Sequence, residues 1–333
     1  MPTSDKTTDW KVESLAYPLN ASAQRELTGL LRTEWTRTDY DWLEAMSGDY
    51  SEKLVIVSFL ARRAGEPLAT ATVHFSRHHP EVAVIGGVLT HREHRDRGLA
   101  GQVIESVLAA AKSAGCSICL LGTARSPHNV YRRHGFDWQN GKVMRCALGA
   151  TDFESRYFAA GQKAVVRAAN WGDLPGVTLF AAQPLTTACL DYSHGLFSGR
   201  YVPAERCLSN FPVLWYDTAA AGGMFEVLAG PEDGRIFGFG TLTRSSSAAR
   251  RQTATVDFAT HDHYEAQLPA LLARLLDGCP TRKIQRVEAM VPVGDEAKLA
   301  CLRSAGFAPL ALLPGILQLN SGPADVHLLR LTL

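Results

Sequence analysis

The sequence predicts an α/β (α+β) protein built from two similar domains that follow one another along the chain. Three observations indicate this fold class. Residues 82–136 alternate between apolar runs and a helical pattern, in the order strand, helix, strand, helix. The length of 333 residues is about twice that of a typical domain of ~150 residues. Finally, segments of the second half repeat segments of the first half at a nearly constant spacing.

Composition limits the classes of partner. Hydrophobic residues make up 46% of the chain and charged residues 20%, which is typical of a globular protein with a sizeable core. The net charge of +1 does not require nucleic acid or an anionic membrane as a partner. Residues 1–14 lack the apolar core of a secretory signal, and no apolar run is long enough to span a bilayer. We therefore expect a cytoplasmic protein with no membrane partner.

The first domain is expected to open with a strand over residues 11–15 and a helix over residues 21–33. Leu27, Leu30 and Leu31 fall on one side of that helix and predict its buried face. Two paired strands follow at residues 53–62 and 67–75, and the Ala-Gly-Glu sequence between them is a hairpin signal.

A buried strand and a long helix come next. Residues 82–88 are apolar apart from Gly86 and Gly87, which indicate a β-bulge or the close approach of another group. Residues 99–114 have helical periodicity, and Gly115 stands where a glycine commonly ends a helix. The remaining expected elements are a strand at 118–121, a short helix that starts at Ser126-Pro127 and carries Tyr131, and a strand at 142–148.

The join before the long helix predicts an anion site. Backbone amides at a helix start bind phosphate readily, and Gly98, Ala100 and Gly101 leave those amides accessible. Arg95 and Arg97 add positive charge nearby. The alternative interpretation of these residues alone is an ordinary glycine turn with two solvated arginines.

Three motifs in order resemble the GNAT acyltransferase superfamily. The matching segments are Val88-x-Thr90, Arg95-x-x-Gly98-x-Ala100 and Tyr131-x-x-x-Gly135-Phe136. They are similar to the splayed fourth strand, the pyrophosphate loop and the Y-x-x-x-G-F element of that family. The resemblance implies a mixed, splayed central sheet flanked by helices in each domain. It also implies acetyl-CoA, or another acyl-CoA, as co-substrate.

The resemblance further implies roles for individual residues. The coenzyme would be bound by Val88, Leu89, Thr90, Arg95, Asp96, Arg97, Gly98, Leu99, Ala100 and Gly101. The amide of Leu89 or Thr90 would stabilise the oxyanion, and we take Thr90 and Tyr131 as the catalytic residues, Tyr131 being the acid that protonates the departing thiolate. The general base stays open among Glu81, His91, Glu93, His94 and a water chain.

The acceptor pocket is the least defined part of the prediction. Acidic and aromatic side chains alternate over residues 34–44, a region that walls the acceptor pocket in GNAT folds. We name Glu34, Asp39 and Tyr40 as candidate substrate residues, because such a wall favours a cationic amine. The alternative is a solvated helix face with its aromatic side chains packed inward.

The internal repeat leads to the second domain. Residues 65–75 parallel residues 234–244, and Gly135-Phe136 parallels Gly306-Phe307. The second copy has no glycine pair after its strand at 255–259, and it has Leu302 in place of Tyr131. We therefore expect a catalytic GNAT domain at residues 1–150 and a degenerate GNAT-like domain, structural or substrate-shaping, at residues 163–333. A chain with two fused copies would act as a monomeric pseudo-dimer or form a homodimer.

We expect no metal. Cys116 and Cys119 form a C-x-x-C inside a buried strand without a partner pair, which favours core thiols. His261, Asp262 and His263 lack helical metal spacing and are interpreted as a polar turn at a strand end.

Three functions are compatible with these observations. The first is an N-acyltransferase that moves an acyl group, acetyl by default, from acyl-CoA to the amine of a small molecule through a tetrahedral intermediate. The second keeps the fold but takes an aminoacyl group from charged tRNA, which predicts a basic surface around Arg132 and Arg133. The third is a non-catalytic coenzyme A binding module.

Overall fold

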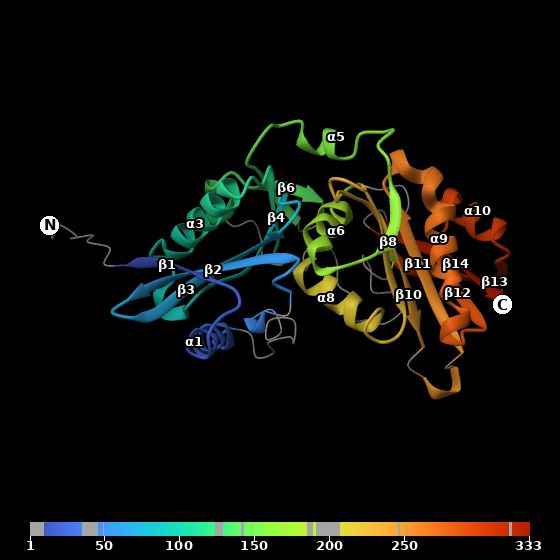
Figure 1. The fold of residues 1–333 in the computed structure, drawn as a ribbon, viewed down its shortest axis with the longest axis horizontal. Coiled ribbons are helices and arrows are strands. Elements are labelled where there is room, and N and C mark those ends of the chain that lie inside the picture. The colour runs from blue at the N-terminus through green and yellow to red at the C-terminus, as the bar shows by residue number, and fades with distance from the viewer. Residues whose placement is uncertain are drawn as a thin grey trace. The chain divides into compact units, whose positions relative to one another are not determined.

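The computed structural model describes residues 10–34, 46–48, 50–123, 129–140, 143–184, 189–190, 207–245, 247–250, 252–319 and 322–333. They form two seven-stranded mixed sheets, each flanked by helices, which confirms the predicted fold class (Figure 1). The first compact unit comprises Met1–Leu121, Arg125–Asp137 and Met144–Ala150. The second comprises Gly122–Ala124, Trp138–Val143 and Thr151–Leu333. The domain limits expected from the sequence stay a prediction.

The first sheet has the strand order β1-β2-β3-β4-β5-β7-β6. Its strands are β1 (Lys11–Ala16), β2 (Leu54–Arg63), β3 (Glu66–Ser76), β4 (Val82–Thr90), β5 (Ile118–Gly122), β6 (Asp137–Asn140) and β7 (Val143–Ala147). The helical elements are α1 (Ala21–Arg32), η1 (Arg92–His94), α3 (Leu99–Ser113) and α4 (Asn129–Arg133), and α5 (Phe153–Tyr157) follows the sheet in the chain. The predicted strands and helices of this half are therefore present, except that Ser126 and Pro127 lie outside the described residues.

Helices α1 and α3 cover opposite faces of the first sheet (Figure 1). Helix α1 begins where the Asn20 side chain accepts hydrogen bonds from the amides of Ser22 and Ala23, and it buries the predicted leucine face. Helix α3 buries Val103 and Val107 completely. These two apolar faces build the core that holds β4 in the middle of the sheet.

The sheet face toward α1 carries buried polar groups. The hydroxyl groups of Tyr17 and Ser58 lie 2.9 Å apart, and those of Ser58 and Thr72 lie 2.7 Å apart. Further along β3, the fully buried His74 has its Nδ1 atom 3.4 Å from the carbonyl oxygen of Val84. Burial lowers the pKa of His74 to about 4, against a smaller opposing effect of that carbonyl.

The second sheet has the order β8-β9-β10-β11-β12-β14-β13, which repeats the first sheet strand for strand. Its strands are β8 (Val165–Ala168), β9 (Met224–Ala229), β10 (Ile236–Arg244), β11 (Thr253–Thr260), β12 (Arg286–Pro292), β13 (Ala308–Leu319) and β14 (Gly322–Thr332). The helical elements are η2 (Trp171–Asp173), α6 (Leu174–Ala181), α8 (Cys207–Asp217), η4 (Ala248–Arg250), η5 (Asp262–Gln267), α9 (Leu268–Asp277), η6 (Pro280–Arg282) and α10 (Glu296–Ser304). Helices α6 and α9 cover opposite faces of this sheet (Figure 1).

The two units also agree in local geometry. The amide of Phe136 donates to the carbonyl of Tyr131, and the amide of Phe307 donates to the carbonyl of Leu302. The intervening glycines, Gly135 and Gly306, have φ angles of +84° and +91°. Such angles favour glycine, because a side chain there is strained. The repeated Gly-Phe pair therefore marks the same helix ending in both units.

A buried ion pair distinguishes the second unit. Lys298 of α10 is fully buried, and its Nζ atom bonds the Oδ1 atom of Asp257 on β11, which is 1% exposed. Burial opposes the charge on this lysine, but attraction to Asp257 and other neighbours outweighs that effect and raises the pKa of Lys298. Lys298 therefore carries its charge inside the core.

We expect His74 to make stability depend on pH. Burial lowers the pKa of His74 to about 4 in the folded protein, whereas a histidine of the unfolded chain has a pKa of about 6.5. Between about pH 6.5 and about pH 4, therefore, His74 binds a proton in the unfolded chain but not in the folded one. The free energy of unfolding should therefore fall as the pH drops through that window, by up to about 3 kcal/mol from this group. Urea unfolding of His74→Gln should show a flatter pH dependence than the parent. The exposed His78→Gln is the control, and an unchanged slope in His74→Gln would contradict the assignment.

Replacement of Lys298 should destabilise the protein strongly. Lys298→Met leaves the Asp257 carboxylate buried without its cation, a change that typically costs about 3–5 kcal/mol. Lys283→Met, at an exposed lysine of the same unit, should change stability by less than about 0.5 kcal/mol. Urea unfolding followed by tryptophan fluorescence measures both values. Equal midpoints for the two variants would show that the buried pair contributes little.

Candidate active site

Strand β4 separates from β5 halfway along its length. It pairs with β5 in parallel from Val82 to Ile85 only, while it remains paired with β3 as far as Thr90. The register with β3 shifts between Thr70 and Thr72, and Gly87 lies at this shift with a φ angle of +60°. The predicted bulge is therefore present, and the sheet is splayed beyond it.

Three polar side-chain atoms near the end of β4 are buried without a partner among the described residues. Within the described part of the chain, the Oγ1 atoms of Thr70 and Thr90 and the Nδ1 atom of His91 are buried without a hydrogen-bond partner. Thr70 pairs with Leu89 in the sheet, and Thr90 and His91 follow directly. Because successive side chains of a strand point to opposite faces, the Thr70 and Thr90 hydroxyls lie on opposite faces of the sheet.

The amides of the last β4 residues can be assigned to the two edges of the strand. The amide of His91 donates to the carbonyl of Leu68 at the end of β3, at 2.8 Å. Successive amides of a strand point to opposite edges. The amide of Thr90 therefore points away from β3, toward the edge from which β5 has diverged, whereas that of Leu89 points to β3.

The start of α3 has the geometry expected for an anion site. Its N-cap, Gly98, has a φ angle of +84° and provides no side-chain cap, and Asp96 is also left-handed, at +60°. A Cβ added at Gly98 would meet no atom within 4 Å. The first amide to bond back to the cap is that of Gln102. The preceding amides of the first turn are thus presented at an uncovered helix end.

Arg95 and Glu34, predicted in different roles, contact each other. The Nη2 atom of Arg95 lies 2.8 Å from Oε2 of Glu34, and its Nε atom donates to the Thr90 carbonyl at 3.3 Å. The Nε atom of Arg92 lies 3.4 Å from the same carboxylate oxygen. Arg97 instead reaches the turn before it, where Nη2 donates to the carbonyl of Glu93 at 3.1 Å. The Glu34 carboxylate therefore pairs with two arginines of the segment between β4 and α3.

Helix α4 brings Tyr131 beside the same loop. The Tyr131 ring is half-buried and packs edge-to-face on Phe136, with ring centroids 6.1 Å apart. A Cβ added at Gly101 would lie 3.2 Å from Nε2 of His134, just after this helix. The helix that carries Tyr131 therefore packs against the first turn of α3. The roles of these residues are not established by their positions, and Asp39 and Tyr40 lie outside the described residues.

Part of the first unit matches a known family. A family model described as the acetyltransferase (GNAT) family matches residues 21–136. These residues form a GNAT acetyltransferase domain. The segment that matches contains the β4 splay, the α3 start and Tyr131.

Solved structures similar to this chain include several acetyltransferases. A putative acetyltransferase from Salmonella typhimurium, solved with its cofactor acetyl-CoA, is 18% identical, has a TM-score of 0.40, and the alignment covers 51% of this chain and 93% of that one. A phosphinothricin acetyltransferase from Sinorhizobium meliloti, in complex with AcCoA, is 17% identical, with a TM-score of 0.41 and coverage of 51% and 88%. A ribosomal-protein-alanine N-acetyltransferase from Brucella melitensis is 17% identical, with a TM-score of 0.40 and coverage of 51% and 99%. No curated protein matches the sequence.

The second unit differs from the GNAT domain at the equivalent strand. Thr72 pairs with Gly86 in the first sheet, and the corresponding Thr241 pairs with Asp257. The β10–β11 register continues without a shift, so this strand has no bulge. The Asp257 carboxylate accepts from the amide of Phe258 at 2.9 Å and bonds Lys298. The Phe258 amide is therefore satisfied within the unit.

Sequence reasoning missed two groupings in the GNAT domain. One is the contact of Glu34 with Arg92 and Arg95, since residues some sixty positions apart show no local signal. The other is the convergence of His91, Glu93 and His94, whose ligand atoms all lie within 4.8 Å of one another. A turn with this H-x-E-H order could have been noted as a cluster. Among the described residues, no helix is both long and apolar enough to cross a membrane.

Proposed function

We propose that the GNAT domain transfers an acyl group, acetyl by default, from acetyl-CoA to the amine of a small molecule. The observation that carries this proposal is the splay of β4 beside an uncovered helix start. A separated strand offers an edge to an extended ligand, and the helix start offers amides to its phosphates. The two features together fit a ligand that has a diphosphate at one end and an amide-containing arm at the other.

The coenzyme is proposed to bind in two parts. The amides of residues 96–101 would hold the pyrophosphate, because no side chain covers this end of α3 and Gly98 leaves open space. The pantetheine arm would pair like an added strand with Val88, Leu89 and Thr90. This edge of β4 is the one from which β5 has diverged.

Thr90 is the proposed oxyanion donor. The direction of the His91 amide toward Leu68 supports Thr90 over Leu89, because the Thr90 amide then points to the open edge. The guanidinium of Arg95 donates to the Thr90 carbonyl at 3.3 Å and adds positive charge at that edge. A preorganised amide beside a cation stabilises the negative oxygen of a tetrahedral intermediate.

The proposed chemistry is direct attack. The neutral amine nitrogen bonds the thioester carbon, the carbonyl oxygen becomes an oxyanion, and the carbon–sulfur bond then breaks as the amide forms. The Tyr131 hydroxyl gives its proton to the departing thiolate, and the proton lost by the amine passes to a base or water. The unperturbed pKa values, about 10 for a phenol and about 8.5 for a thiol, make this transfer feasible over a short hydrogen bond.

The second unit is proposed to be a degenerate GNAT-like domain with a structural or substrate-shaping role. The position of Gly86 is taken by Asp257, and that of Tyr131 by the buried Leu302. A 3₁₀ segment and Gln267, rather than a left-handed glycine, precede α9. The second unit would therefore lack the acid and the uncovered helix start, and its Phe258 amide is already bonded to Asp257.

The anion site can be tested with a matched pair of glycines. Gly98 and Gly115 stand at the two ends of α3, have φ angles of +84° and +89°, and would place a Cβ in open space. Gly98→Glu and Gly115→Glu should therefore cost similar stability, on the order of 1 kcal/mol. Only Gly98→Glu puts a carboxylate at the proposed pyrophosphate position, so it should weaken acetyl-CoA binding at least ~10-fold.

Calorimetry with acetyl-CoA measures the binding of both variants. Equal affinities would exclude the α3 start as the pyrophosphate site. No binding by the parent protein would exclude the acyl-CoA proposal and favour the aminoacyl-tRNA donor.

Tyr131→Phe tests the acid. Loss of the hydroxyl should lower kcat about 10²- to 10⁴-fold and leave the Kd for acetyl-CoA unchanged, because the ring and its packing on Phe136 remain. A thiol-release assay over a panel of amines gives kcat, and calorimetry gives Kd. An unchanged kcat in this variant would remove Tyr131 from the mechanism.

A further inference from the structure

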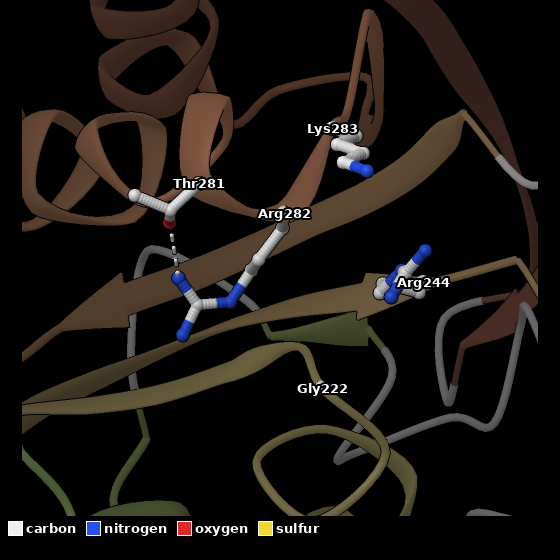
Figure 2. Close-up of a pocket in the computed structure, with 5 residues that line it drawn as sticks. All are labelled: Gly222, Arg244, Thr281, Arg282 and Lys283. Atoms are coloured by element: carbon white, nitrogen blue, oxygen red, sulfur yellow. Dashed lines mark hydrogen bonds between the residues drawn. The ribbon is translucent and has the colours of Figure 1, made fainter.

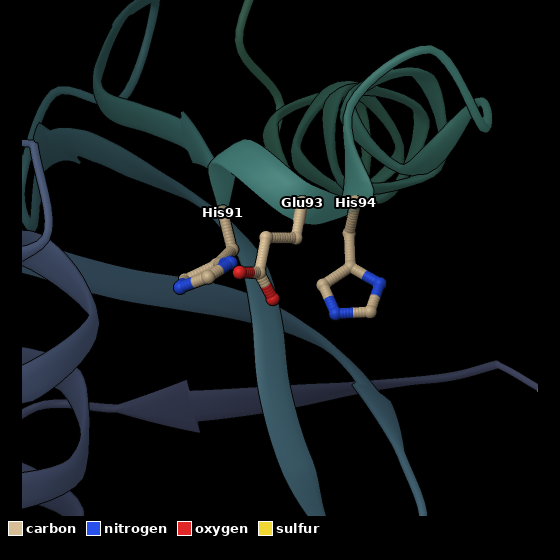
Figure 3. Close-up of side chains that lie close together, drawn as sticks. All are labelled: His91, Glu93 and His94. Atoms are coloured by element: carbon tan, nitrogen blue, oxygen red, sulfur yellow. The ribbon is translucent and has the colours of Figure 1, made fainter.

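We propose that the turn between β4 and α3 binds a divalent transition-metal cation of the Zn²⁺ type through His91, Glu93 and His94. One ligand atom from each residue lies within 4.8 Å of the other two. Figure 3 shows the three side chains extending from the same side of the short η1 turn. This inference departs from our expectation, based on the sequence alone, that the protein binds no metal.

The donor set suits such a cation. Two imidazole nitrogens and one carboxylate form a ligand set common for Zn²⁺, with a fourth position left for water. Tetrahedral ligands at ~2.0–2.1 Å from a metal lie roughly 3.4 Å apart. The Glu93 side chain is exposed and that of His94 half-exposed, so side-chain rotation can close the remaining gap.

The backbone holds the ligands in place. The His91 amide donates to Leu68 at 2.8 Å, and the His94 amide donates to the His91 carbonyl at 2.9 Å. The Nδ1 atom of His91 is buried without a hydrogen-bond partner among the described residues. A buried ring nitrogen without a partner lowers the stability of the fold. A bound cation offsets this loss, either by coordinating Nδ1 itself or by binding Nε2 and so fixing which ring nitrogen carries the proton.

The surrounding charges permit a cation. Arg97 reaches Nδ1 of His94 at 3.4 Å, which leaves Nε2 for a metal. That contact is at the limit of hydrogen-bond range and Arg97 is exposed, so its movement on binding costs little. Arg92 and Arg95 lie close by, but the Glu34 carboxylate pairs with both. The turn is therefore less positive than its arginines suggest.

The equivalent turn of the second unit provides an internal comparison. The His261 amide donates to Phe237 as that of His91 does to Leu68. There, however, His263 Nδ1 lies 2.7 Å from the Phe158 carbonyl oxygen, and the His261 ring stacks on Phe158 with centroids 4.4 Å apart. The His261 and His263 rings therefore contact Phe158 of the same unit. Within the described residues, only the first turn brings such ligand atoms together.

Metal titration tests the proposal independently of acyl transfer. Tag-free, chelator-treated protein is titrated with Co²⁺, whose visible absorption reports a tetrahedral nitrogen and oxygen site, and with Zn²⁺ by calorimetry. We expect saturable binding of one ion per chain, and at least ~10-fold weaker binding by Glu93→Gln and by His94→Ala. Circular dichroism verifies that these exposed and half-exposed substitutions leave the fold intact.

His78→Ala and His79→Ala, in an exposed loop of the same unit, are the controls and should bind as the parent does. The proposal is overturned if the parent shows no saturable binding. It is equally overturned if Glu93→Gln and His94→Ala bind like the parent, since the ion would then sit elsewhere. The proposed transferase function can fail without affecting either result.

Discussion

The geometry of the GNAT domain depends on one irregularity in β4. Pairing of β4 with β3 continues through the bulge at Gly87 to Thr90, while pairing with β5 stops at Ile85. The extra residue of the bulge shifts the residues beyond it, Leu89 and Thr90, by one position relative to β3. Because Gly87 has a φ of +60°, most side chains at this position would be strained. The same turn of the chain positions His91 and the loop that leads to α3.

The second unit shows what happens when this irregularity is absent. It has the same strand order, and β11 also leaves β12 early, after Thr255. Asp257 stands at the register position of Gly86, and its carboxylate bonds the Phe258 amide and the buried Lys298. A buried ion pair needs such extra hydrogen bonds to offset desolvation. In the second unit, the strand that corresponds to β4 thus carries a buried ion pair with a lysine of α10, whereas β4 has a glycine at this position.

Much of the first unit follows from local patterns. The leucine face of α1, the bulge glycines and the end of α3 at Gly115 were predicted, because each reflects neighbouring residues and backbone sterics. The repeat was visible because Gly306 and Phe307 conserve a helix ending. The Lys298–Asp257 pair and the Glu34–Arg95 contact were not predicted, since long-range ion pairs depend on which elements the fold brings together. The catalytic roles of Thr90 and Tyr131 stay predictions, because a role in catalysis is tested only by measuring the reaction.

The ion pair of Glu34 links the two sides of the proposed reaction. Glu34 follows α1, which covers one face of the sheet, whereas Arg95 precedes α3 on the other. Their contact lies at the end of β4, where Arg95 also holds the Thr90 carbonyl. A cationic acceptor drawn to Glu34 would compete with Arg95 for the same carboxylate and thereby change the charge beside the Thr90 amide. Acceptor binding and oxyanion stabilisation would then be coupled through a single carboxylate, without any movement of the sheet.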